Sequence, residues 1–143
     1  MIPHEKKKVL FLCTHNSARS QMAEGLLKSL YSEYDVHSAG SNPRTINPLA
    51  IKVMEEIGID ISNNRSKSIR EFNGIIFDSV ITLCDGEDDT CPIFTLGKSY
   101  LHKSFQDPKA FDGTDNQKLG AFRRIRDEIR DWVKENFHDH DKI

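Results

Sequence analysis

The chain has 143 residues, which fits one domain with a substantial core over residues 1–143. Its apolar fraction of 37%, charged fraction of 29% and net charge of -2 argue against binding of nucleic acid or of a membrane. We find no signal peptide and no segment of membrane-spanning length, so we expect a cytoplasmic protein and treat it as a monomer. The three cysteines are too few for a disulfide scaffold, and in a reducing compartment such cysteines are more often catalytic or metal-binding.

The first expected element is a buried strand over residues 9–12, where the run VLFL is short, continuous and apolar. Residues 13–20 follow and have the sequence CTHNSARS. After them, apolar residues recur at helical spacing from Met22 to Leu30, with polar residues between them. Residues 13–20 are therefore predicted to form a loop that joins the end of a strand to the start of a helix.

That junction suits an anion, because backbone N–H groups converge at a helix N-terminus, where the helix dipole is positive. A tetrahedral oxyanion fits there, and the planar guanidinium of Arg19 can hold two of its oxygens. The same field favours the thiolate of Cys13, to which Ser17 and Ser20 can donate hydrogen bonds. The alternative is a buried structural cysteine with an ordinary surface arginine. It is less favourable because a cation in the first turn of a helix needs an anion.

Residues 34–40 alternate weakly and end in a glycine, as expected of a second strand near the edge of a sheet. Asn47 then caps a helix that has Pro48 at its first position and is closed by Gly58. These signals predict a strand followed by a helix.

The second half of the chain begins with a short helical turn from Ser66 to Phe72, for which Ser66 is the predicted cap. The β-branched and apolar run over residues 78–84 predicts the third strand, buried in the sheet. Residues 85–92 are polar and acidic and predict an exposed, mobile loop. A fourth strand is expected over residues 100–105, and a long amphipathic helix over residues 116–137.

Strands and helices that alternate with these lengths indicate an α/β domain with a four-stranded parallel sheet, right-handed crossovers and helices on both faces. We predict the strand order 2-1-3-4. In that order the winding of the sheet reverses between strands 1 and 3, and the ligand crevice lies outside their carboxyl ends. Cys13 and Cys84 end those two strands, so they should face one another across the same crevice.

Cys13, the five residues after it, Arg19 and Ser20 resemble the signature of the low-molecular-weight protein tyrosine phosphatase fold. Further stretches are similar to the thioredoxin-coupled arsenate reductases built on that fold: CTHNSARSQMAEG at 13–25, Asn47-Pro48, Asp60-Ile61-Ser62 and TLCDGEDDTCP at 82–92. The resemblance runs from Val9 to the last helix. The pair Cys84 and Cys91 is what separates the reductases from the phosphatases.

The resemblance implies reduction of arsenate to arsenite, for arsenic detoxification, by a relay of three thiols. Cys13 forms a covalent adduct with arsenate, Cys84 attacks the Cys13 sulfur and expels arsenite, and Cys91 then attacks Cys84. Thioredoxin is the implied reductant of the final disulfide, and no cofactor is implied. The resemblance assigns the oxyanion, with phosphate or sulfate as mimics, to one continuous stretch: Thr14, His15, Asn16, Ser17, Ala18, Arg19 and Ser20.

Asp107 matches the general acid of the family, which protonates the oxygen that leaves as the adduct forms and which likewise precedes a proline. Without the resemblance, Asp107-Pro108 is explained by a turn. Asn16 would hold the shape of the oxyanion loop, because asparagine tolerates left-handed backbone conformations, and the alternative is an ordinary surface residue.

Two positions depart from the family. Ala18 stands where many relatives have a further cysteine, so the loop contains one thiol. Some reductases of this type bind potassium beside the loop, and Asn16, Glu24 and Ser38 match polar ligands there, but Lys67 stands where an acidic ligand is expected. Because a lysine ammonium can replace the ion by pairing with Glu24, we expect no required potassium and no other metal.

The main alternative is a low-molecular-weight protein tyrosine phosphatase, since Cys13, Arg19 and Asp107 suffice for a phosphocysteine mechanism. Aromatic side chains that could hold a phenol ring are sparse near these residues. A zinc module built on Cys84 and Cys91 is disfavoured, because their separation exceeds the gap of about two to four residues that is common in zinc sites. A non-enzymatic oxyanion sensor is the third alternative, which any turnover would exclude.

Overall fold

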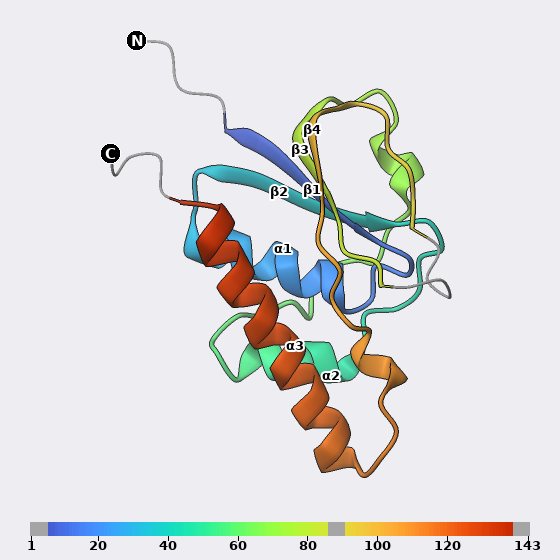
Figure 1. The fold of residues 1–143 in the computed structure, drawn as a ribbon, viewed down its shortest axis with the longest axis vertical. Helices are drawn as coiled ribbons and strands as arrows, with labels where there is room; N and C mark the ends of the chain where they lie inside the picture. The colour runs from blue at the N-terminus through green and yellow to red at the C-terminus, as the bar shows by residue number, and fades with distance from the viewer. Residues whose placement is uncertain (1–5, 86–90, 139–143) are drawn as a thin grey trace.

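The computed structural model describes residues 6–85 and 91–138 of the chain. Its elements, in chain order, are β1 (Lys7–Cys13), α1 (Arg19–Leu30), β2 (Tyr34–Gly40), α2 (Pro48–Glu55), η1 (Ile69–Phe72), β3 (Phe77–Thr82), β4 (Gly97–His102), η2 (Pro108–Ala110) and α3 (Asp115–Asn136), where η denotes a 3-10 helix (Figure 1). Most of the predicted loop over residues 85–92 lies outside the described residues. Among the helices of the described part, none combines the length and the apolar character that a membrane crossing requires.

The strands form one parallel sheet in the order β2-β1-β3-β4, which confirms the predicted order. Cys13, the last residue of β1, pairs with Gly40 of β2. On the other side of β1, Leu12 pairs with Thr82 of β3, and the Leu83 N–H donates to the Leu12 carbonyl at 2.9 Å. The end of β1 therefore lies beside the segment that leads to Cys84, at the carboxyl edge of the sheet.

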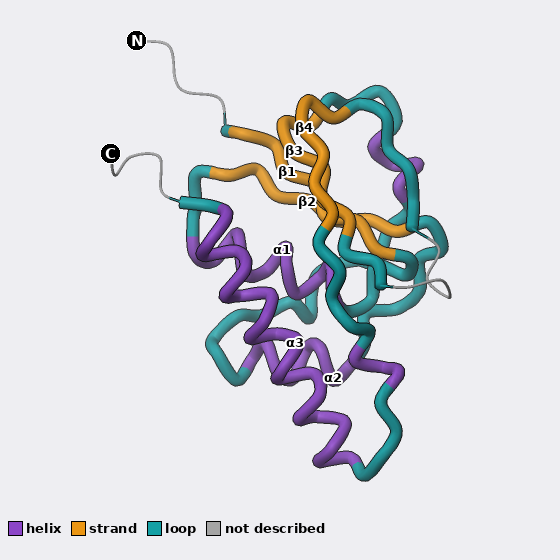
Figure 2. Tube along the Cα trace, in the orientation of Figure 1, coloured by secondary structure: helices purple, strands orange, loops and turns teal. Residues whose placement is uncertain are grey.

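Each face of the sheet has its own hydrophobic core. All three α-helices lie on one side of the sheet, as Figure 2 shows, where α1 packs against the strands and the helices share a core with side chains such as Phe11 and Ile81. The other face is covered by η1 and Phe94, which pack on a smaller cluster: Leu10, Leu12, Ala39, Phe72, Phe77 and Val80. Both faces are thus covered, but the prediction of helices on both faces holds only in part: within the described residues the second face has one turn of 3-10 helix, and all three α-helices lie over the first.

The fourth strand begins and ends three residues earlier than predicted, at Gly97–His102 instead of residues 100–105. It is the edge strand, and all of its residues after Gly97 are exposed. Such a strand carries no alternation of apolar and polar residues, so its position could not be predicted from periodicity. Gly97 is required by packing, because a Cβ there would lie 2.7 Å from a methyl carbon of Val80.

The predicted caps of α2, Asn47 at its start and Gly58 at its end, are confirmed. The Asn47 side chain accepts a hydrogen bond from the Leu49 N–H at 2.9 Å at the start of α2, and Gly58 follows that helix with a φ of 80°, in the left-handed region. Thr114 and Gln117 form a capping box, which begins α3 one residue before the predicted start.

The predicted cap of the short helical turn is wrong. Ser68, not Ser66, caps η1, because its hydroxyl accepts a hydrogen bond from the Arg70 N–H at 3.1 Å. Ser66 instead donates its hydroxyl hydrogen to the carbonyl of His15 at 2.9 Å. Its role is to anchor the loop after β1.

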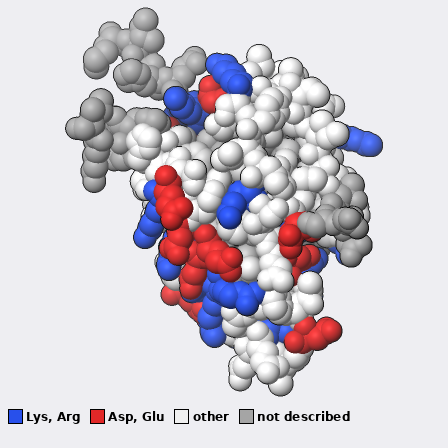
Figure 3. Space-filling view, viewed as in Figure 1, with Lys and Arg blue, Asp and Glu red and all other residues white. Residues whose placement is uncertain are grey.

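Charged side chains of both signs lie over the helices on the face shown in Figure 3. Arg123 of α3 pairs with Glu56 at 2.7 Å, and this hydrogen bond is the main reason why the pKa of Glu56 falls to about 2. Arg126 is buried and donates to the Val53 carbonyl at 2.9 Å and to Glu56 at 3.0 Å. These two arginines join α3 to the end of α2.

Candidate active site

The loop between β1 and α1 is anchored through its carbonyl groups. Four successive carbonyls accept hydrogen bonds from groups outside the loop or from α1. They are the carbonyls of Thr14 (from Asn42 N–H, 2.8 Å), His15 (from Arg44 N–H, 3.1 Å, and Ser66), Asn16 (from Gln21 Nε2, 3.2 Å) and Ser17 (from Asn47 N–H, 2.9 Å). The loop is therefore held with its carbonyls bonded outward. The N–H groups at the start of α1 are then the backbone groups suited to an anion.

Asn16 makes hydrogen bonds from both ends of its amide. Its backbone φ is 49°, in the left-handed region, where asparagine is tolerated. Its oxygen accepts from Gln21 Nε2 and from the Lys67 N–H, both at 2.9 Å. Its nitrogen donates to the hydroxyls of Ser20 at 2.7 Å and Ser38 at 2.9 Å. The completely buried Asn16 thus links the loop to α1, β2 and the segment before η1.

Cys13 lies at the floor of the site and is 2% exposed. Its sulfur is 2.8 Å from the Ser20 hydroxyl oxygen. Because that oxygen already accepts a hydrogen from Asn16, the hydroxyl hydrogen of Ser20 is available for the sulfur. Of the two serines predicted to donate to Cys13, Ser20 is placed to do so, whereas Ser17 has no hydrogen bond to the sulfur among the described residues.

Arg19 and Asp107 meet above Cys13. The guanidinium is 3% exposed and donates from Nη1 to the Phe105 carbonyl at 3.2 Å. Its Nη2 is 3.8 Å from Asp107 Oδ2, while Asp107 Oδ1 accepts from the Lys109 N–H at 3.0 Å. A guanidinium held between a carbonyl and a carboxylate is pre-positioned for an anion.

Cys13, Arg19 and Asp107 line a small cavity of about 10 Å³. It is lined by Cys13, His15, Ser17, Ala18, Arg19, Asp107 and Lys109. The sequence analysis assigned six of these to the site but missed Lys109, which lies far from the loop in sequence and has no motif of its own. Its position two residues after a predicted general acid was the one available signal.

The remaining two cysteines differ in exposure. Cys84 is 4% exposed and lies two residues past the end of β3, the strand next to β1. The predicted end of the third strand at residue 84 is therefore wrong by two residues. Neighbouring strands lie about 4.8 Å apart, so Cys13 and Cys84 lie at the same edge of the sheet. Cys84 is not among the described residues that line the cavity over Cys13, so the facing of the two thiols across one crevice stays a prediction. Cys91 is exposed, and all three cysteines are present as free thiols.

Glu24 and Lys67 form a second buried polar cluster behind the loop. Glu24 accepts a hydrogen bond from the Ser38 hydroxyl at 2.8 Å, pairs with Lys28 at 3.0 Å, and lies 3.8 Å from the Lys67 ammonium. Burial lowers the pKa of Lys67 below its ordinary value, and the charge of Glu24 offsets part of this shift. The described residues include no group of three His, Cys, Asp or Glu side chains that could hold a metal ion. The replacement of potassium by Lys67 stays a prediction.

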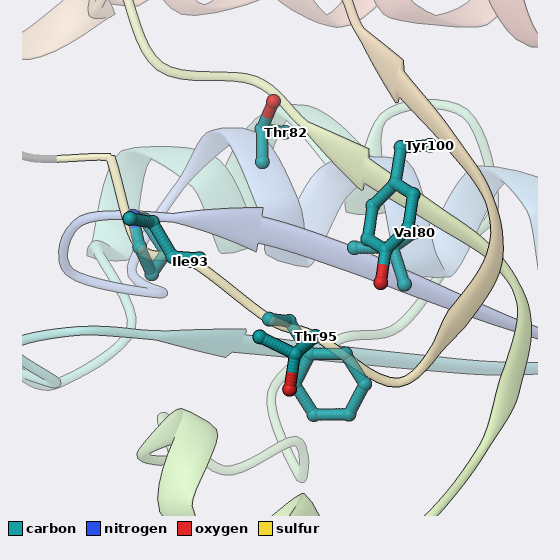
Figure 4. A pocket seen from close by; sticks show the side chains of 7 residues that line it. Val80, Thr82, Ile93, Thr95 and Tyr100 are labelled. Atoms are coloured by element: carbon teal, nitrogen blue, oxygen red, sulfur yellow. The ribbon is translucent and has the colours of Figure 1, made fainter.

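A larger groove lies elsewhere and lacks this chemistry. Figure 4 shows Val80, Thr82, Ile93, Thr95 and Tyr100 around a space of about 450 Å³ beside β3 and β4. No charged side chain is among the described residues that line it. The small cavity over Cys13 is therefore the candidate active site, because it combines a thiol, a guanidinium and a carboxylate.

Comparisons with known proteins agree with this assignment. The family model of low molecular weight phosphotyrosine protein phosphatase matches residues 8–142. An arsenate reductase of Halalkalibacterium halodurans is 48% identical over 130 residues, which cover 90% of this chain and 94% of that protein.

Two solved structures extend the comparison. One, described as an arsenate reductase in the phosphate binding state, has 34% identity and a TM-score of 0.72, and the match covers 91% of this chain and 95% of that one. The thioredoxin-dependent arsenate reductase of Corynebacterium glutamicum has 31% identity and a TM-score of 0.66, over 94% of this chain and 63% of that one. The chain therefore belongs to the low molecular weight phosphotyrosine protein phosphatase family and, within it, to the arsenate reductases.

Proposed function

We propose that this protein reduces arsenate to arsenite by passing two electrons outward through Cys13, Cys84 and Cys91, with thioredoxin as the final reductant. One observation carries the proposal: a buried thiol at the floor of an anchored oxyanion loop has a second buried thiol just past the end of the adjacent strand. A phosphatase has no use for the second thiol. Similarity to a thioredoxin-dependent arsenate reductase supports the choice of reductant.

In the first step the loop N–H groups and Arg19 hold the arsenate, and the sulfur of Cys13 attacks arsenic. The bound anion competes with Asp107 for Arg19, since the two side chains are 3.8 Å apart and only weakly paired. A sulfur–arsenic bond forms and an arsenic–oxygen bond breaks. Asp107, at the rim, supplies the proton that lets the oxygen leave as water. Arsenic remains As(V) in this adduct.

In the second step the sulfur of Cys84 attacks the sulfur of Cys13. A disulfide forms, the sulfur–arsenic bond breaks, and its electron pair stays on arsenic, which leaves as As(III). Cys91 then attacks Cys84, which frees Cys13 and moves the disulfide to residues 84 and 91. Because Cys91 is exposed, this disulfide has one sulfur that the dithiol of thioredoxin can reach. The dithiol is oxidised as Cys84 and Cys91 are reduced.

Counting thiols tests the proposal. Stoichiometric arsenate, added without reductant, should lower the number of free thiols of the reduced protein from the three present to one. Phosphate is the matched control, because it has the same shape but no reducible centre, and it should leave all three. If arsenate also leaves all three while an aryl phosphate is hydrolysed, the site is a phosphatase, for which Cys13, Arg19 and Asp107 are sufficient.

The order of the relay is tested by Cys91→Ser. This variant should complete at most one turnover and then stop with a disulfide between Cys13 and Cys84, which peptide mapping under non-reducing conditions would identify. Cys84→Ser should stop earlier, before arsenite is released. Sustained thioredoxin-driven turnover by Cys91→Ser would contradict the relay.

A further inference from the structure

Lys109 lines the cavity over Cys13 although it belongs to η2 and not to the oxyanion loop. Its backbone N–H donates to Asp107 Oδ1 at 3.0 Å, and Asp107 Oδ2 lies 3.8 Å from Arg19 Nη2. The backbone of Lys109 is thus fixed to the carboxylate that faces the guanidinium. This places a second basic side chain at the rim of the site.

Basic side chains outnumber carboxylates among the described residues that line the cavity. Lys109 is exposed, and its ammonium makes no ion pair with another residue of the described ranges. His15, on the loop, is held by its Nδ1, which must donate to the Asn42 carbonyl at 3.0 Å, since a carbonyl can only accept. Asp107 is the one carboxylate among the described residues that line the cavity, and it already faces Arg19. Lys109 therefore adds a positive charge that forms no ion pair with a carboxylate of the described residues.

We propose that Lys109 determines specificity: it selects free inorganic oxyanions with two or more negative charges over phosphate esters of aromatic alcohols. This inference rests on the proposed function, because it assigns substrate choice to the same site. It adds a residue that binds the substrate from the rim, opposite the thiol.

The direction of attack explains the selection. Because Cys13 attacks from the floor, the departing oxygen lies on the far side of the central atom, at the rim. In a free oxyanion this oxygen is a small hydroxyl on a molecule that carries net negative charge, and the Lys109 ammonium attracts that charge. In an aryl ester the same place holds an uncharged ring. The ring offers the ammonium no negative charge and would displace water from this strongly hydrated group.

Anion binding is the first test, because it does not depend on turnover. Binding of inorganic phosphate to the reduced, full-length protein is measured by calorimetry for the wild type, Lys109→Ala, Lys109→Arg and the control Lys52→Ala. Lys52 is an exposed lysine of α2 that does not line the cavity, so the control makes the same change in net charge. Lys109→Ala should weaken phosphate binding about fivefold, as expected for one exposed charge, and Lys109→Arg and Lys52→Ala should bind like the wild type.

Kinetics give the second test. Lys109→Ala should raise KM for arsenate by a similar factor with kcat unchanged, because the ammonium contributes to binding throughout the reaction. Turnover of p-nitrophenyl phosphate should stay the same or increase. Phosphate binding by Lys109→Ala as tight as in the wild type, or an equal loss for arsenate and the aryl ester, would overturn the inference. If the wild type reduces no arsenate, the proposed function fails, and phosphate binding still decides the role of Lys109.

Discussion

The oxyanion loop and the segment around β4 flank the same sheet but differ in how they are held. The loop is buried, four of its carbonyls accept hydrogen bonds, and Asn16 ties it to three other parts of the chain. At the edge strand of the sheet, the residues of β4 after Gly97 are exposed, and in the segment before it Ile93 is 86% exposed. Cys13 belongs to the first region and Cys91 to the second.

This difference matches the two tasks of the proposed relay. A nucleophile works best in a pocket whose dipoles are fixed before the substrate arrives, because no reorganisation is then needed during the reaction. A thiol that hands electrons to another protein must be reachable from outside. We therefore expect the stability of the fold to depend strongly on the loop and weakly on the segment after Cys91.

Removing the amide of Asn16 should have the largest effect. Asn16→Ala removes the hydrogen bond that the buried Ser38 hydroxyl accepts and the acceptor of the Lys67 N–H, and it places alanine at a φ of 49°. We expect the free energy of unfolding to fall by about 3 kcal/mol, measured by urea denaturation. The control is Asn73→Ala, at an exposed asparagine with a φ of -56°. Equal losses in the two variants would refute the special role of the loop.

The loop itself was the most predictable part of the molecule. Its strand, its helix and the cap at Asn47 each have a local signal in the sequence, and these signals agree with one another. The order of the strands followed from the chain of alternating elements. The anchoring role of Ser66 was missed, because its bond to His15 joins residues 51 apart in sequence.

The exposed region was the least predictable. β4 has no buried face, so neither periodicity nor composition marks its ends, and the prediction was three residues late. Lys109 was missed for a different reason, because a lysine in a polar turn is usually a solvated side chain. Its place at the active site depends on the packing of η2, which no local pattern reports.

Within the loop, Ser20→Ala tests the support of the nucleophile. The Ser20 hydroxyl is 2.8 Å from the Cys13 sulfur and accepts from Asn16. Its loss should slow single-turnover reduction of arsenate about tenfold, by removing one charge-assisted hydrogen bond, and should change the melting temperature little. Ser29→Ala, at an exposed position of the same helix, should react at the wild-type rate. A wild-type rate in Ser20→Ala would mean that the hydroxyl does not assist the sulfur.

Lys67 makes the region behind the loop sensitive to pH. Because its pKa is lowered in the folded protein, the folded state releases this proton at a lower pH than the unfolded chain does. The free energy of unfolding should therefore rise as the pH rises through the folded pKa toward the ordinary value of 10.5. Lys67→Met should lack this rise, which the difference between the two unfolding curves over that range would show. Parallel pH dependence in both proteins would contradict the assignment.

The response to potassium is an independent test of the role of the Lys67 ammonium. If Lys67 replaces the ion beside Glu24, potassium chloride should raise the melting temperature of the wild type no more than sodium chloride does. A large rise that is specific to potassium would show that the ion still binds there.

Substitutions in the exposed segment around β4 should change the free energy of unfolding least. Ile93→Ser removes a side chain that is 86% exposed, so the free energy of unfolding should change by no more than about 0.5 kcal/mol. Ile81→Ser is the matched control, because that isoleucine is 1% exposed in the core beneath the helices, and its replacement should cost about 3 kcal/mol. Both changes in the free energy of unfolding would be measured by urea denaturation at neutral pH. A loss above about 1 kcal/mol in Ile93→Ser would mean that the segment after Cys91 packs more tightly than its exposure indicates, and the contrast with the loop would fail.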